Sequence, residues 1–269
     1  MVGRFTRSPR CPFVSSPLLV VLLWVLGMVR AMAFDVSGYV EAEARIFTYS
    51  ALHASQRSKP LSLAFAPEFY HGWSDGRHSL RVAPFLRIDS SDPQRSHFDV
   101  REALYWRAEE RWELRAGIGK VFWGVTESRH LVDIVNQSDM VENVDGEDKL
   151  GQPMLALTLK AESSALELFV LPGFRERSYP GPRGRLRSAP AVDKDAASYE
   201  SSAGDKHIDY ALRWSGVYDA FDIGVSYFIG TSRDPRRCMT GSATCRLAHT
   251  TIRCNASLLM RRPRLMPCC

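Results

Sequence analysis

Residues with reactive side chains are scattered through this sequence, but their spacing matches none of the common catalytic or metal-binding patterns. The seven histidines, at positions 53, 71, 78, 97, 130, 207 and 249, lack the HExxH spacing of a zinc hydrolase. The glycines at 117, 119 and 124 break the spacing of a dinucleotide-binding turn, and no G-x-S-x-G elbow is present. The acidic run at 145–148 lacks the ligand spacing of a calcium loop. We therefore predict no catalytic residue, no metal ligand and no cofactor.

Charge offers a different chemistry, ion selection, because acidic residues are concentrated in one segment and arginines recur in others. The charged residues expected on the wall, most of them arginines, are Arg81, Arg87, Arg101, Arg107, Glu113, Arg115, Asp209 and Arg213. The acidic segment contributes Asp133, Asp139, Glu142, Asp145, Glu147 and Asp148. An acidic loop that faces a basic wall would impose an electric field across the space between them. The alternative is a solvated outside loop with ordinary charge.

A two-residue period predicts the strands that would carry this wall. Leu80, Val82, Leu86 and Ile88 fall on one face, opposite Arg81 and Arg87. Next, Phe98, Val100, Leu104 and Trp106 alternate with Asp99, Arg101, Tyr105 and Arg107. The other clear ranges are 112–119, 208–215 and 221–229, and weaker ones are 35–48, 62–73, 154–162 and 165–172. The pattern predicts about nine strands, each with one apolar and one charged face.

The connections between these ranges alternate in length. Short links fall at 74–77, 108–111, 162–164 and 216–220, and long links at 49–61, 90–96, 125–153 and 176–206. Tight turns at one end and long loops at the other are typical of outer-membrane barrels. The predicted fold class is therefore all-β, an antiparallel up-and-down transmembrane β-barrel. About nine strands without a closing strand would leave this barrel incomplete.

The first 33 residues have the pattern of a cleavable signal peptide. Arg4, Arg7 and Arg10 precede an apolar run at 18–29, and Ala31-Met32-Ala33 supplies a cleavage site. The run is too short for a typical membrane-spanning helix, which needs about 20 residues. We therefore predict export and a location in the outer membrane, with a single membrane anchor as the alternative.

The segment 236–269 differs in composition from the body of the chain, 34–235. It has no acidic residue, and it contains Cys238, Cys245, Cys254, Cys268 and Cys269, five of the six cysteines. Their crowding does not resemble a disulfide framework or a zinc site. We predict an unstructured, out-of-frame tail on a truncated protein; the alternative is a genuine basic, cysteine-rich tail. The net charge of +5 comes from the two ends, so it does not indicate nucleic-acid binding.

The junction at 117–139 links a strand to the acidic segment. Gly117 and Gly119 fall at inward positions of the strand, where the missing side chains would leave room for a loop folded inside the barrel. The following segment, 125–153, has a mixed apolar and polar composition that could hold a short helical turn before the acidic residues. Porin-type barrels often use one long loop as a constriction.

The motif at this junction consists of Gly119, Lys120, Trp123 and Gly124, followed by Thr126, Glu127 and Asn136. In it the chain resembles a group of Gram-negative outer-membrane porin-like proteins, many of them uncharacterised, over roughly 34–235. The resemblance implies a transport-type β-barrel without a known substrate.

The expected function is therefore passage of small solutes or ions across the outer membrane, in contact with its lipid and with a homo-oligomer possible. This chain would be a partial or non-functional copy if the tail is out of frame. The main alternative is a soluble secreted β-sandwich that binds carbohydrate or protein through its long loops. An outer-membrane hydrolase is a lesser alternative, since the catalytic motifs are missing.

Overall fold

The structure is a computed structural model that describes residues 34–123, 134–219, 221–240, 244–249 and 251–261. It is 56% strand and 3% helix. The strands are β1 (Asp35–Ala44), β2 (Leu61–Trp73), β3 (His78–Asp89), β4 (His97–Ala108), β5 (Trp112–Gly119), β6 (Gln152–Lys160), β7 (Ser164–Pro172), β8 (Ala191–Tyr199), β9 (Ile208–Tyr218), β10 (Phe221–Thr231), β11 (Arg236–Thr240), β12 (Thr244–His249) and β13 (Thr251–Arg261), with short 3-10 helices η1 (Pro93–Arg95) and η2 (Gly204–Lys206). No helix among these residues is long and apolar enough to cross a membrane.

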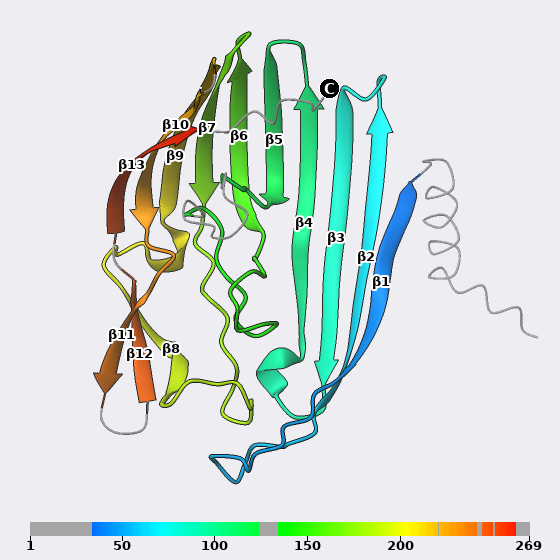
Figure 1. Ribbon diagram of the computed structural model, residues 1–269, viewed down its shortest axis with the longest axis vertical. Coiled ribbons are helices and arrows are strands. Elements are labelled where there is room, and N and C mark those ends of the chain that lie inside the picture. Colours follow the sequence, from blue (N-terminus) through cyan, green and yellow to red (C-terminus); the bar gives the residue numbers. More distant parts are fainter. Residues whose placement is uncertain (1–33, 124–133, 220, 241–243, 250, 262–269) are drawn as a thin grey trace, which may run out of the picture. The chain divides into compact units, whose positions relative to one another are not determined.

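The main sheet is an antiparallel meander in which sequence neighbours pair (Figure 1). Strands β1 to β7 follow one another, β9 and β10 come next, and β13 is the tenth strand. The sheet is not closed, so β1 and β13 are its edges among the described strands. The all-β class, the antiparallel meander and the nine strands expected from the sequence are confirmed, and the sheet remains open.

The tight turns have a local cause. Ser74, Asp75 and Gly76 between β2 and β3 have φ values of 55°, 57° and 81°. Asp219, between β9 and β10, has a φ of 54°. Consecutive residues with positive φ match the twist of two antiparallel strands, and Asp and Gly adopt this conformation more readily than most residues. The short link predicted at 74–77 is therefore a hairpin turn, and the link predicted at 216–220 is shorter than expected, because β9 continues to Tyr218.

The sheet has an apolar face and a charged face, because residues directly opposite each other on neighbouring strands point to the same side. One row of the apolar face is Leu114, Leu157, Leu168, Leu212 and Tyr227. Other exposed members of that face are Leu63, Phe65, Leu86, Ile88, Phe98, Leu155, Leu159, Val170, Tyr210 and Val225. Rows of the charged face include Glu113, Thr158, Glu167, Arg213 and Ser226.

The assignment of faces in β4 is a correction to the sequence analysis. The register shifts between Ala83 and Pro84, which pair with Glu102 and Val100, so Arg101 is an extra residue in a bulge. Beyond the bulge, Leu104 and Trp106 lie on the charged face. Tyr105 and Arg107 lie on the apolar face, where Arg107 pairs with Leu114. A period of two predicts the reverse, because one extra residue exchanges the two faces of everything that follows it.

The tail also differs from its prediction as an unstructured segment. Residues 236–240, 244–249 and 251–261 are strands, and β13 pairs with β10 from Thr231↔Thr251 to Phe221↔Arg261. The segment 176–206, expected to be a loop, contains β8, which pairs in parallel with β12. Without a partner, the edge of β10 would carry unpaired backbone donors and acceptors. These groups can pair with the backbone of another strand whatever its side chains are, so the composition of the tail does not prevent the pairing. The segments 1–33 and 262–269 lie outside the described residues.

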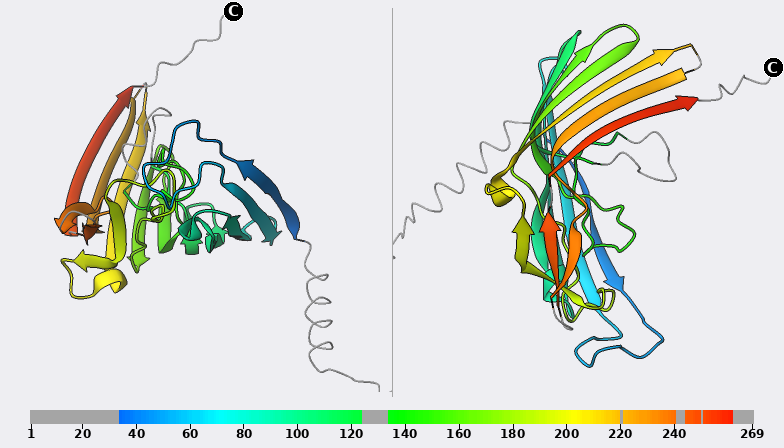
Figure 2. Two further views of the ribbon diagram at one scale, coloured as in Figure 1. Left: turned by 90° about the horizontal axis from the view of Figure 1, so that it is seen from below. Right: turned by 90° about the vertical axis from the view of Figure 1, so that its left-hand side faces the viewer.

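The largest cluster of buried apolar residues lies on the charged face, where the segment after β5 covers the sheet. Val121, Trp123 and Val135 from this segment pack with Met154, Ala156, Phe169, Leu171, Ala211 and Phe228 of β6, β7, β9 and β10. Figure 2 shows the segment that follows residue 134 on the concave side of the sheet. The core therefore holds a long connection against the charged face and leaves the apolar face uncovered by it.

Candidate functional site: a charged cleft under the 134–150 loop

The loop formed by residues 134–150 lies on the charged face of the sheet. Val135, Asn136, Gln137 and Asp139 are only 1–2% exposed. Residues 135–139 therefore do not form a solvated outside loop. The expected helical turn is not present in the described part of the loop, which makes isolated bridges at Ser138↔Lys149 and Asp139↔Ser178 instead.

Asn136 fixes the start of the loop to the end of β5. Its side-chain Oδ1 accepts a hydrogen bond from the Val121 amide at 2.7 Å. Its Nδ2 donates to the carbonyl oxygens of Gly119 at 3.1 Å and Leu150 at 2.9 Å. One buried amide thus satisfies three backbone groups from three parts of the junction. The motif that ended in Asn136 therefore marks a structural clamp in this fold.

Of the other motif residues, Gly119 and Trp123 lie next to this clamp, whereas Thr126 and Glu127 lie outside the described residues. Trp123 is 3% exposed and packs edge-on against Phe169, with ring centroids 5.5 Å apart. A Cβ at Gly119 would overlap the side chains of Met154 and Leu104. At Gly117, where φ is +128°, it would overlap the carbonyl oxygen of Ala103. The atoms nearest to a Cβ at either glycine belong to neighbouring strands, so the missing side chains allow these strands to pack closely. Gly124 lies outside the described residues.

Two acidic side chains of the loop pair with arginines of the sheet. Arg101 donates to Asp139 Oδ2 at 2.6 Å, and Arg87 Nε lies 2.7 Å from Glu142 Oε2. Burial by itself would raise the pKa of Asp139, but Arg101 and a hydrogen bond from Ser178 outweigh it and hold that pKa below its usual value. Burial dominates at Glu142 and raises its pKa, although Arg87 opposes the shift. The predicted contact between acidic loop and basic wall exists at these two pairs.

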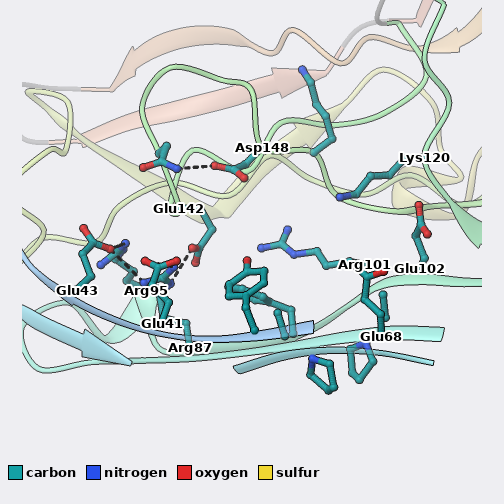
Figure 3. Close-up of a pocket in the computed structure, with 18 of the residues that line it drawn as sticks. Glu41, Glu43, Glu68, Arg87, Arg95, Arg101, Glu102, Lys120, Glu142 and Asp148 are labelled. Carbon is teal, nitrogen blue, oxygen red and sulfur yellow. Dashed lines mark hydrogen bonds and ion pairs between the residues drawn. The ribbon is translucent and has the colours of Figure 1, made fainter. Parts of the chain in front are cut away.

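A cleft of about 360 Å³ remains between the loop and strands β1–β4 (Figure 3). Its charged lining consists of Glu41, Glu43, Arg45, Glu68, Arg81, Arg87, Arg95, Arg101, Glu102, Lys120, Glu142, Asp148 and Lys149. Arg81 lies 2.6 Å from Glu68 and 3.1 Å from Glu102 on the sheet itself. Acidic and basic groups therefore alternate around the cleft. The wall of the cleft is therefore not uniformly basic, as the sequence predicted, but carries charges of both signs.

Four of the remaining predicted wall residues lie in two environments, the charged face and the apolar face of the sheet. Arg115 and Arg213 lie 3.5 and 3.8 Å from Glu167 on the charged face, and Glu113 pairs there with Lys160. Arg107 lies on the apolar face at the end of β4. There it pairs with Glu109 at 2.9 Å and lies over the Trp112 ring, 5.0 Å from its centroid. The hypothesis that Arg107 lines a pore is therefore wrong.

Asp209 has a different role from the pore lining that the sequence predicts. It is fully buried, accepts a hydrogen bond from the Thr231 amide at 3.0 Å, and pairs with Arg233 and His207. Arg233 in turn donates through Nε to the Val135 carbonyl oxygen at 2.8 Å. This network anchors the end of β10 to the start of the loop. Asp209 is thus an internal support.

The acidic residues at the tip of the loop are less enclosed. Asp145 and Glu147 are exposed, whereas Asp148 lines the cleft and accepts a hydrogen bond from Asn143 at 2.8 Å. Asp133 lies outside the described residues. Glu41, Glu43 and Glu68 also line the cleft, although they were not predicted as site residues. The alternation of acidic and small side chains in 35–48 was a usable signal for the first two.

Comparison with known proteins adds no family to this geometry. No protein-family model matches the chain, and no curated protein is significantly similar to it.

Proposed function

We propose that this chain forms the wall of an outer-membrane, porin-like transport barrel for small solutes or ions. The observation that carries the proposal is the apolar face, which continues across the main sheet. Its central members, such as Leu155, Leu168 and Tyr210, are 36–50% exposed. A soluble protein would bury so wide an apolar surface, whereas a transmembrane barrel presents it to lipid.

The opposite face supports the same proposal. It carries ion pairs between neighbouring strands and a cleft lined by charged side chains, all of which need water or partners nearby. In a transmembrane barrel the inward side is polar, and a loop folded against it narrows the passage. The loop at 134–150 has this position relative to the charged face, since Asp139 and Glu142 reach Arg101 and Arg87.

A single charge on the apolar face tests the proposal. Leu168 lies in the middle row of that face, so Leu168→Arg should lower the fraction of the refolded chain that inserts into lipid vesicles. An arginine at the bilayer centre of a barrel costs about 2–4 kcal/mol. Leu168→Ala also removes the leucine side chain but adds no charge, so this variant should still insert. Insertion is measured by co-flotation with vesicles and protection of the strands from protease.

The soluble β-sandwich makes the opposite prediction. It requires the chain to stay monomeric in buffer without detergent and not to bind to vesicles. Under that alternative, Leu168→Arg would improve solubility and change nothing else. Recovery of the wild-type chain in that state would overturn the proposed function.

A further inference from the structure

Three potential ligand atoms meet where the loop touches the start of β4. His97 Nε2 lies 3.7 Å from Glu142 Oε1 and 3.9 Å from Asp139 Oδ2. One such atom from each residue lies within 4.8 Å of the other two. The residues come from β4 and from two positions of the loop, so no sequence motif joins them. The spacing of ligand residues along the sequence therefore gives no sign of this cluster.

The hydrogen bonding of His97 directs a lone pair toward the two carboxylates. Its Nδ1 lies 3.0 Å from the carbonyl oxygen of Arg95, which can only accept, so Nδ1 carries the proton and donates. In the neutral ring Nε2 is then an acceptor. Within the described residues, Nε2 and Glu142 Oε1 are both buried atoms without a hydrogen-bond partner. Glu142 is itself only 5% exposed, so two buried acceptors face each other.

A proton on Nε2 would not form a hydrogen bond with either carboxylate. Separations of 3.7 and 3.9 Å exceed the 2.7–3.2 Å of an N–H···O hydrogen bond. They are close to the separation of two ligands around one metal ion. Bonds of about 2.1 Å at a tetrahedral angle place two ligand atoms about 3.4 Å apart. The two distances from His97 Nε2 exceed this value by about 0.3 and 0.5 Å, and the three ligand atoms all lie within 4.8 Å of one another, so side-chain movements without a change of fold would bring them to a common ion.

We propose that His97, Asp139 and Glu142 bind a divalent first-row transition-metal ion of the zinc class. One imidazole and two carboxylates suit such an ion. The carbonyl oxygen of Arg95 orients the imidazole, as the second partner of a metal-binding histidine usually does. Arg101 and Arg87 hold the two carboxylates in place, and their positive charges limit the affinity.

The surroundings give an ion a route to this site. A cavity of about 210 Å³ is lined by His97 and Asp139, together with Gln94 and Glu176. Glu142 borders the charged cleft on its other side. Water from the cavity can complete the coordination that three protein ligands leave open. Bound metal would join β4 to the loop, and this inference does not depend on whether the barrel transports anything.

The site is tested with Zn²⁺ and the full-length chain refolded in detergent. Cysteine thiols also bind zinc, so they are alkylated first. Isothermal titration should give one Zn²⁺ per chain. His97→Gln and Glu142→Gln should each weaken binding at least tenfold. The matched controls are His71→Gln, on the apolar face of β2, and Asp145→Asn, at the exposed tip of the loop; both should bind like the wild type. Co²⁺ absorption provides a second readout of nitrogen and oxygen ligands.

Circular dichroism of each variant checks that it has folded. If Glu142→Gln fails to fold, His97→Gln decides the question alone, because the hydrogen bond that the described structure gives its side chain is to a local carbonyl oxygen. The proposal is overturned if the folded wild-type chain takes up no Zn²⁺ after alkylation. It is equally overturned if both ligand variants bind as tightly as the two controls.

Discussion

At the scale of single residues, position in the structure decides what each polar side chain does. Asn136 satisfies three backbone groups with one amide, whereas Asp209, equally buried, anchors Arg233 and the end of β10. Both residues are hidden from any solute. The groups that a solute would meet are those around the cleft, such as Arg81, Glu68 and Glu102.

Asn136→Ala should loosen the junction between β5 and the loop. Each buried backbone group left without a partner costs about 1–3 kcal/mol, and the substitution leaves three. The midpoint of urea unfolding in detergent should fall clearly, and protease should cut the loop sooner. Asn143→Ala is the matched control, because Asn143 is exposed and bonds only at the surface. Equal behaviour of the two variants would contradict the role assigned to Asn136.

At the scale of elements, β4 and β5 are joined at a point where side chains are not tolerated. Gly117 lies opposite Leu104 with a φ of +128°, and a Cβ there would overlap the backbone of Ala103. The bulge at Arg101 lies nearby and exchanges the faces of β4 beyond it. A bulge bends its strand and increases the local twist. This part of the sheet therefore brings Arg101 toward the loop.

Gly117→Ala should destabilise the pairing of β4 with β5. The backbone conformation alone costs about 1–3 kcal/mol for a residue with a Cβ, and the overlap with Ala103 adds to this. Gly224→Ala, in β10, is the control, because a Cβ there meets nothing within 4 Å and φ is not positive. Yield of folded protein and the unfolding midpoint compare the two. A fully stable Gly117→Ala chain would contradict the geometry at this position.

At the scale of the molecule, the sheet separates apolar from charged groups but does not close. In a bilayer, its edges at β1 and β13 would carry backbone groups that need partners. Association with a second copy would supply them, which fits the possible homo-oligomer. The charges of the inner face are largely paired with each other, so a passage along it should show modest ion preference.

The two faces can be tested by removing one arginine from each. Arg81→Gln leaves Glu68 and Glu102 without their partner in the cleft and should shift the reversal potential of reconstituted protein toward cation preference. Arg107→Gln makes the same change in charge on the apolar face and should leave the reversal potential unchanged. Identical shifts in the two variants would contradict the face assignment of β4. If the reconstituted protein conducted no ions at all, the proposed transport function would lose its support.

The sequence by itself determined the strands, their antiparallel order and most of the two-faced pattern, because a period of two is a local property of the chain. It left open whether the 125–153 segment folds against the charged face or forms a solvated outside loop. Tertiary structure decided the bulge at Arg101, the pairing of β13 with β10 and the partners of Asp209. It also brought His97, Asp139 and Glu142 together. These depend on register and on contacts between distant segments, and a one-residue shift in register reverses every side chain that follows.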